Sequence, residues 1–252
     1  MAPTFVLGSE ATPHGLDIVV AGQKSGQLYA LSAQAGAVLW ATSPAPGGLE
    51  GGLSWGVAVD ESAVYYTAIN SNREAFTLAG DSSSIANSAF GAASLRDGSV
   101  LWQTAAPRNT SSVVVPIVAN DVVLVGASGN WSAASFFPQG PGSLLALNKR
   151  TGEIVREVPL DAYFHAGIAA VHEYVLFGTG YAGFEEATKG SFQAWKVEAA
   201  EGGGGDGHGG GEAEEELERK KAEFARKKEE LRRKIDELEK EGDELDKLRD
   251  EL

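Results

Sequence analysis

The sequence predicts an all-β fold of about four repeated antiparallel units, followed by one long α-helix. Three observations support this prediction. A turn unit recurs along the chain, short apolar runs lie between the turns, and a heptad pattern runs through the C-terminal segment.

The recurring turn unit starts with a small residue, has a glycine six positions later and a tryptophan four positions after that. It occupies residues 30–40 and 92–102 and returns at 146–156 with Arg156 in place of the tryptophan. Its turn glycines are Gly36, Gly98 and Gly152. Each copy is typical of two strands joined by a tight turn, so one supersecondary unit is used several times.

Short apolar or β-branched runs flank these turns and predict the other strands. One set lies at residues 17–22, 63–67, 121–126 and 173–178. A second set, at 55–59, 113–118 and 167–171, precedes three of them. Four antiparallel strands per repeat is the pattern of a β-propeller blade. We therefore expect residues 1–198 to form a partial propeller, with three complete blades and a first blade that lacks its opening strand.

A closed propeller has 4–8 blades, so the predicted array exposes strand edges and an apolar flank. The sequence leaves three alternatives open: a fragment, a truncated chain, or one part of an assembly. For an assembly, the expected partner is a homo-oligomer or a protein that supplies the missing blades.

Composition excludes several classes of function. Residues 1–200 hold 16 acidic and 9 basic side chains, and residues 201–252 hold 19 and 12, so each part has a net charge of −7. Nucleic acid is therefore not an expected partner. With no cysteine, the chain has no disulfide, no thiolate metal site and no Cys-x-x-Cys-His haem attachment site. No apolar run is long enough for a membrane helix, and the N-terminus does not have the pattern of a signal peptide.

The C-terminal segment differs in composition from the repeats. Residues 199–211 are Gly-rich and predict a flexible linker, in which His208 is expected to be solvated. Residues 212–252 predict a charged helix, because leucine or phenylalanine recurs every seven positions from Leu217 to Leu252. The companion core positions include only one apolar residue, Ile235. Both a single charged helix and a weak dimeric coiled coil therefore remain open.

Residues 3–198 resemble the pyrroloquinoline quinone (PQQ) repeat propellers of quinoprotein alcohol dehydrogenases, in particular the polyvinyl-alcohol-dehydrogenase-like branch. The matching segments are residues 19–26, 47–56 and the turn units. The resemblance implies that Trp40 and Trp102 form a docking motif, in which each indole packs on the neighbouring blade. It also implies a secreted or periplasmic protein.

The same resemblance implies a cofactor site. A Gly-Gly-x-x-Trp element places Trp55 against the quinone, Asn70 at the calcium ion and Lys24 at the quinone oxygens. Stacking of a quinone on indole and coordination of a hard cation by an amide oxygen are sound chemistry. We therefore expect PQQ and calcium, and no haem.

The chain departs from the family where the catalytic aspartate is expected. The equivalent stretch, residues 108–117, contains no carboxylate, although alcohol oxidation requires a base near the hydroxyl. Asp60 is expected in a turn between strands, and His14, His165 and His172 have no metal-ligand spacing. Two functions remain: PQQ-linked alcohol oxidation by a completed site, or a non-catalytic propeller fragment that acts as a scaffold or interaction module. The catalytic residues stay unknown.

Overall fold

The computed structural model describes residues 3–49, 51–53, 55–81, 83–130, 140–180 and 190–197, together with residue 226. The residues up to 198 form one compact unit. Apart from residue 226, the predicted linker at 199–211 and the predicted helix at 212–252 lie outside the described residues, so both stay predictions. Within the described part of the chain, no helix is long and apolar enough to cross a membrane.

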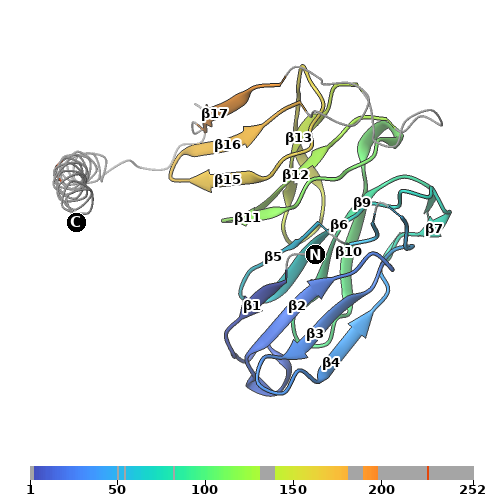
Figure 1. Ribbon diagram of the computed structural model, residues 1–252, viewed down its shortest axis with the longest axis vertical. Helices are drawn as coiled ribbons and strands as arrows, with labels where there is room; N and C mark the ends of the chain where they lie inside the picture. Colours follow the sequence, from blue (N-terminus) through green and yellow to red (C-terminus); the bar gives the residue numbers. More distant parts are fainter. Residues whose placement is uncertain are drawn as a thin grey trace, which may run out of the picture. The chain divides into compact units, whose positions relative to one another are not determined.

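The described part of this unit contains four antiparallel sheets that follow one another along the chain (Figure 1). The strands of the first sheet, in spatial order, are β1 (Thr4–Val6), β2 (Ile18–Gly22), β3 (Leu28–Ser32) and β4 (Val38–Thr42). Those of the second sheet are β10 (Val100–Ala105), β9 (Ala89–Ser94), β6 (Ala63–Ala68) and β5 (Val57–Val59).

The third and fourth sheets continue the series. The strands of the third sheet are β11 (Ile117–Ala119), β12 (Val122–Ala127), β13 (Ser143–Asn148) and β14 (Ile154–Pro159). Those of the fourth are β15 (Ile168–Val171), β16 (Tyr174–Gly178) and β17 (Phe192–Lys196). A small hairpin, β7 (Phe76–Thr77) with β8 (Ser84–Ile85), and two 3-10 turns, η1 (Pro13–Gly15) and η2 (Pro107–Asn109), lie in the connections. The all-β prediction is confirmed.

Each sheet packs face to face on the next, because its two central strands are apolar on both sides. The first core includes Val20 and Leu28 of the first sheet and Val64 of the second. A second core joins the second and third sheets, and a third core joins the third and fourth. The opening strands contact one another in order, β1 with β5, β5 with β11 and β11 with β15. This serial contact is the arrangement of blades around a propeller axis.

Two tryptophans connect neighbouring sheets. The Trp40 Nε1–H donates to the Leu95 carbonyl at 2.9 Å, and the Trp102 Nε1–H donates to the Lys149 carbonyl at 2.9 Å. A Cβ atom on Gly98 would lie 2.5 Å from Cε3 of Trp40, and one on Gly152 would lie 2.4 Å from Cε3 of Trp102. Both glycines also have positive φ angles, of 73° and 74°. A side chain at either turn would therefore displace the indole.

Two details of the strand prediction are wrong. The first sheet has an opening strand, since β1 pairs with β2. Most of the predicted strand at 113–118 is instead a buried connection, because its backbone bonds to side chains. The Val113 N–H donates to Ser128 Oγ at 3.0 Å, and the Val114 carbonyl accepts from the Thr67 hydroxyl at 2.8 Å.

Candidate functional site

The candidate site lies at one end of the sheets, where the long connections gather. The connections between sheets, residues 43–56, 106–116 and 160–167, leave the sheets at the same end as the turn at 23–27 and the segment at 69–88. Lys24, Trp55 and Asn70 all belong to these connections. The antiparallel order of the strands therefore brings the three predicted cofactor residues to one end of the unit.

Lys24 is exposed and forms hydrogen bonds with the connection at 43–56. Its Nζ donates a hydrogen bond of 2.8 Å to the Leu49 carbonyl. Its own carbonyl accepts one of 3.0 Å from the Gly48 N–H. Lys24 thus anchors the segment 43–56, which carries Trp55.

Asn70 is buried, with 0% of its surface exposed, and has a positive φ of 50°. Its Nδ2 donates to the carbonyls of Glu74, at 2.9 Å, and Asn87, at 3.3 Å. Its Oδ1 accepts from the Glu74 N–H at 3.1 Å. Asparagine tolerates this left-handed conformation better than most residues. The side chain closes the segment between β6 and β9.

These hydrogen bonds of Asn70 clamp the segment between β6 and β9, and the side chains of Asn87 and Ser88 extend this clamp to the connection at 106–116. The Asn87 Nδ2 donates to the carbonyls of Ala106 and Thr110, at 2.9 and 3.2 Å. The Ser88 hydroxyl donates to the Ile69 carbonyl at 2.6 Å and accepts from the Ser112 N–H at 2.8 Å. These groups are buried, so the hydrogen bonds satisfy backbone atoms that water cannot reach.

Trp55 meets an aromatic pair from a distant connection. Its ring lies edge-on to His165, with centroids 5.1 Å apart and planes at 84°, and His165 lies 5.9 Å from Tyr163. Trp55 is 38% exposed. Burial lowers the pKa of His165, which favours the neutral imidazole. His165 carried no local sequence signal, since its partner lies far away in the sequence.

Calcium takes six to eight oxygen ligands, and both polar atoms of the buried Asn70 amide already bond to the backbone, which leaves one lone pair of Oδ1 for a cation. Within the described ranges, no group of three or more histidine or carboxylate side chains could hold a metal. Asp60 lies at the opposite end of the sheets, in the turn between β5 and β6, as expected.

Asp60 connects the second and third sheets. It accepts hydrogen bonds of 2.9 Å from the Ser62 and Ala63 N–H groups and the Tyr65 hydroxyl, and lies 3.3 Å from Lys149 Nζ. Burial raises the pKa of the Asp60 carboxyl. The hydrogen bonds outweigh burial, so this pKa lies below its ordinary value.

Asp60→Asn is expected to destabilise the protein at pH 7 by about 1.5–3 kcal/mol, the usual range for hydrogen bonds to a charged group. A lowered folded-state pKa gives stability above the unfolded value of about 3.9, and this stability is lost as pH falls through the folded pKa. The two proteins should therefore converge in urea midpoint below about pH 4. Asp161→Asn, at an exposed position, is the control. Parallel curves for wild type and Asp60→Asn from pH 3 to 7 would contradict this role.

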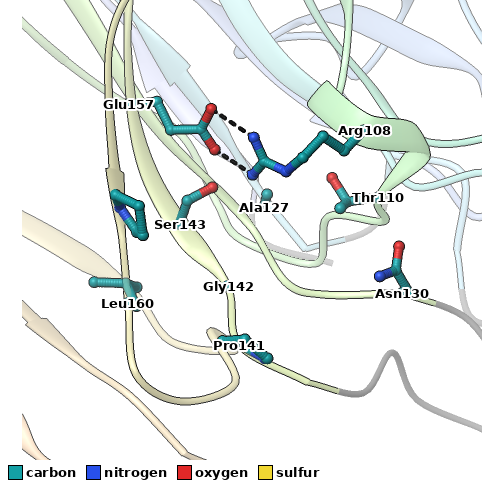
Figure 2. A pocket seen from close by; sticks show the side chains of 10 residues that line it. Arg108, Thr110, Ala127, Asn130, Pro141, Gly142, Ser143, Glu157 and Leu160 are labelled. Carbon is teal, nitrogen blue, oxygen red and sulfur yellow. Dashed lines mark hydrogen bonds and ion pairs between the residues drawn. The ribbon is translucent and has the colours of Figure 1, made fainter.

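A hollow of about 480 Å³, lined by both polar and apolar residues, lies beside this end of the sheets, between the connection at 106–116 and the third sheet (Figure 2). Arg108 and Glu157 face each other across it as an ion pair, with Nη1 donating to Oε2 at 2.9 Å and Nη2 to Oε1. The contact with Arg108 lowers the pKa of Glu157. Glu157 is consequently a poor general base near neutral pH. Neither residue belongs to a sequence motif that indicates a function.

Comparison with known proteins identifies the family. The profile of the PQQ_2 family, described as outer membrane protein assembly factor BamB, matches residues 3–196. The chain belongs to this PQQ-repeat family. The sheets are therefore referred to below as blades 1 to 4, in chain order.

A polyvinylalcohol dehydrogenase from a Pseudomonas species is 31% identical over 113 residues, which are 43% of this chain and 16% of that enzyme. BamB from Moraxella catarrhalis is 18% identical, with a TM-score of 0.41, over 66% of this chain and 41% of its own. The quinohemoprotein alcohol dehydrogenase from Comamonas testosteroni is 14% identical, with a TM-score of 0.48, over 71% and 30%. The chain spans less than half the length of each of these relatives.

Proposed function

We propose that this chain is a non-catalytic propeller segment that acts as a binding scaffold. One observation carries the proposal: the Asn70 amide, expected at a calcium ion, is fully buried and bonded to the backbone of its own connection. The Lys24 Nζ is likewise bonded to the Leu49 carbonyl. The assembly role named in the family description is in keeping with a scaffold.

The test is a calorimetric titration of PQQ with calcium into the full chain. We expect no heat of binding at micromolar concentration, and the same result for Trp55→Ala. Binding by the wild-type chain that Trp55→Ala abolishes would contradict the proposal. Circular dichroism on both samples would establish that they are folded.

A second candidate function is PQQ-linked oxidation of an alcohol by a completed site. The observation that favours it is the partly exposed indole of Trp55, which offers a face on which a quinone could stack. The stretch at 108–117, where the family resemblance places the catalytic base, contains no carboxylate. Reduction of an artificial dye in the presence of PQQ, calcium and an alcohol, lost in Trp55→Ala, would favour this function over the scaffold.

A further inference from the structure

Equivalent positions of the four blades can be compared directly, because their central strands share one register. Gly22 pairs with Leu28, Thr67 with Phe90, Gly126 with Leu144 and Gly178 with Phe192. In blades 1, 2 and 3 the large apolar side chain of this pair faces the following blade. Leu28, Phe90 and Leu144 are accordingly 0%, 1% and 7% exposed.

Phe192 breaks this pattern, because it is 77% exposed at the corresponding position of blade 4. Tyr174 is 41% exposed, whereas its counterparts Ile18 and Ala63 are 0% and 3% exposed. Leu176 and Ala194, which are paired across β16 and β17, lie on the same face. We call this set, Phe192, Tyr174, Leu176 and Ala194, the trailing face. It has the apolar character of a face that is buried between the other blades.

Blade 1 has the complementary leading face. Val19 and Leu31 are partly exposed there, while their counterparts Val123 and Leu147 in blade 3 are 1% and 0% exposed. Phe5, which pairs with Val19, is 56% exposed. We define the leading face by Phe5, Val19 and Leu31. The turn glycine of blade 1, Gly36, is also uncovered. A Cβ atom there would meet nothing within 4 Å, whereas one on Gly98 or Gly152 would contact the tryptophan of the preceding blade.

We infer that the trailing face of one chain packs on the leading face of a second copy, and that two such contacts close a ring. The contact repeats the packing of central strands found three times within the chain, and the described residues supply the central-strand faces that it needs. A head-to-tail contact either closes or forms an open filament. Two copies of four blades give eight, within the range of known propellers, whereas three copies would exceed it.

This inference deepens the proposed scaffold function, because it names the first partner as a second copy. Its test is independent of that function, since association is measured without PQQ or calcium. If the chain forms a dimer and the dimer binds PQQ, the pairing stands and only the proposed lack of catalysis is contradicted. If the chain is a folded monomer that binds no PQQ, only the pairing is overturned.

The experiment measures the mass of the full 252-residue chain in solution by light scattering across a concentration series. We expect twice the 26.3 kDa of one chain. Phe192→Glu and Phe5→Glu should each raise the dissociation constant at least ten-fold. Phe192→Leu should preserve the dimer, because leucine occupies the corresponding positions in blades 1 and 3. Val155→Glu changes an apolar side chain, 53% exposed, in the outer strand of blade 3 and should also preserve it.

Mixing the Phe192→Glu and Phe5→Glu chains provides a test of the geometry. Their heterodimer keeps one intact junction, so the mixture should contain more dimer than either variant alone. No gain on mixing, or a dimer unaffected by Phe5→Glu, would overturn the head-to-tail arrangement. Leu231→Glu, in the predicted heptad, should leave the dimer intact. If it alone gives monomer, association belongs to the tail and the inference is wrong.

Discussion

Trp102→Ala is expected to lower the free energy of unfolding by about 3–5 kcal/mol, the usual cost of deleting a large buried aromatic side chain. The indole is 6% exposed and packs on Gly152 of blade 3, with its ring centroid 6.3 Å from that of Tyr65. Its removal would leave a cavity between blades 2 and 3. The Lys149 carbonyl would also lose the hydrogen bond that Nε1–H donates to it.

Urea unfolding followed by circular dichroism would measure this effect, since a shifted midpoint with an unchanged slope reports stability. Trp102→Phe keeps much of the ring but not the N–H donor, so it should lie between wild type and Trp102→Ala. Trp55→Ala is the matched tryptophan control and should change stability by less than about 1 kcal/mol, because Trp55 is partly exposed. Equal effects of Trp102→Ala and Trp55→Ala would contradict a docking role for Trp102.

The blade pattern could be predicted because its signals are local. Each turn glycine has a positive φ, each tryptophan stands at a fixed distance from its turn, and each central strand is a short apolar run. The opening strand β1 was missed because residues 7–17 separate it from β2, whereas only two or three residues join each of the other opening strands to the strand that follows it. The extent of strand 113–118 was overestimated because its apolar run is buried as an irregular connection. The side chains of Thr67 and Ser128 make hydrogen bonds to the backbone of this segment, in place of those that a neighbouring strand would make in a sheet.

The candidate site was less predictable, because its contacts join distant parts of the sequence. The sequence correctly placed Asp60 in a turn, but not its contacts with Tyr65 and Lys149. Nothing near Trp55 indicated that His165 would lie against it. Whether the Asn70 amide and the Lys24 ammonium bond to the backbone depends on how the connections fold back onto one another. A family pattern can locate such residues, but it does not specify whether their polar atoms remain available to a ligand.

Asn70→Ala is expected to destabilise the protein by about 2–4 kcal/mol, because it removes the donor to the buried Asn87 carbonyl and two part-buried hydrogen bonds to the Glu74 backbone. Alanine is also less favourable than asparagine at the φ of 50°. The change should be visible as a lower urea midpoint. Asn72→Ala, which truncates the same side chain at a nearby exposed position, is the control and should cost much less. An Asn70→Ala protein as stable as wild type would contradict the clamp.

Asn70→Asp separates a backbone clamp from a calcium ligand. The new carboxylate would face the Glu74 and Asn87 carbonyls, so burial and repulsion should raise its folded-state pKa. The variant should then be destabilised at pH 7 and regain stability relative to wild type as pH falls through that raised pKa, levelling off below about 3.9. A calcium ligand predicts the opposite, since a carboxylate binds calcium well and bound calcium stabilises the fold. We therefore expect millimolar calcium to leave the midpoints of both proteins unchanged. An upward shift in Asn70→Asp alone would return this position to the cofactor site.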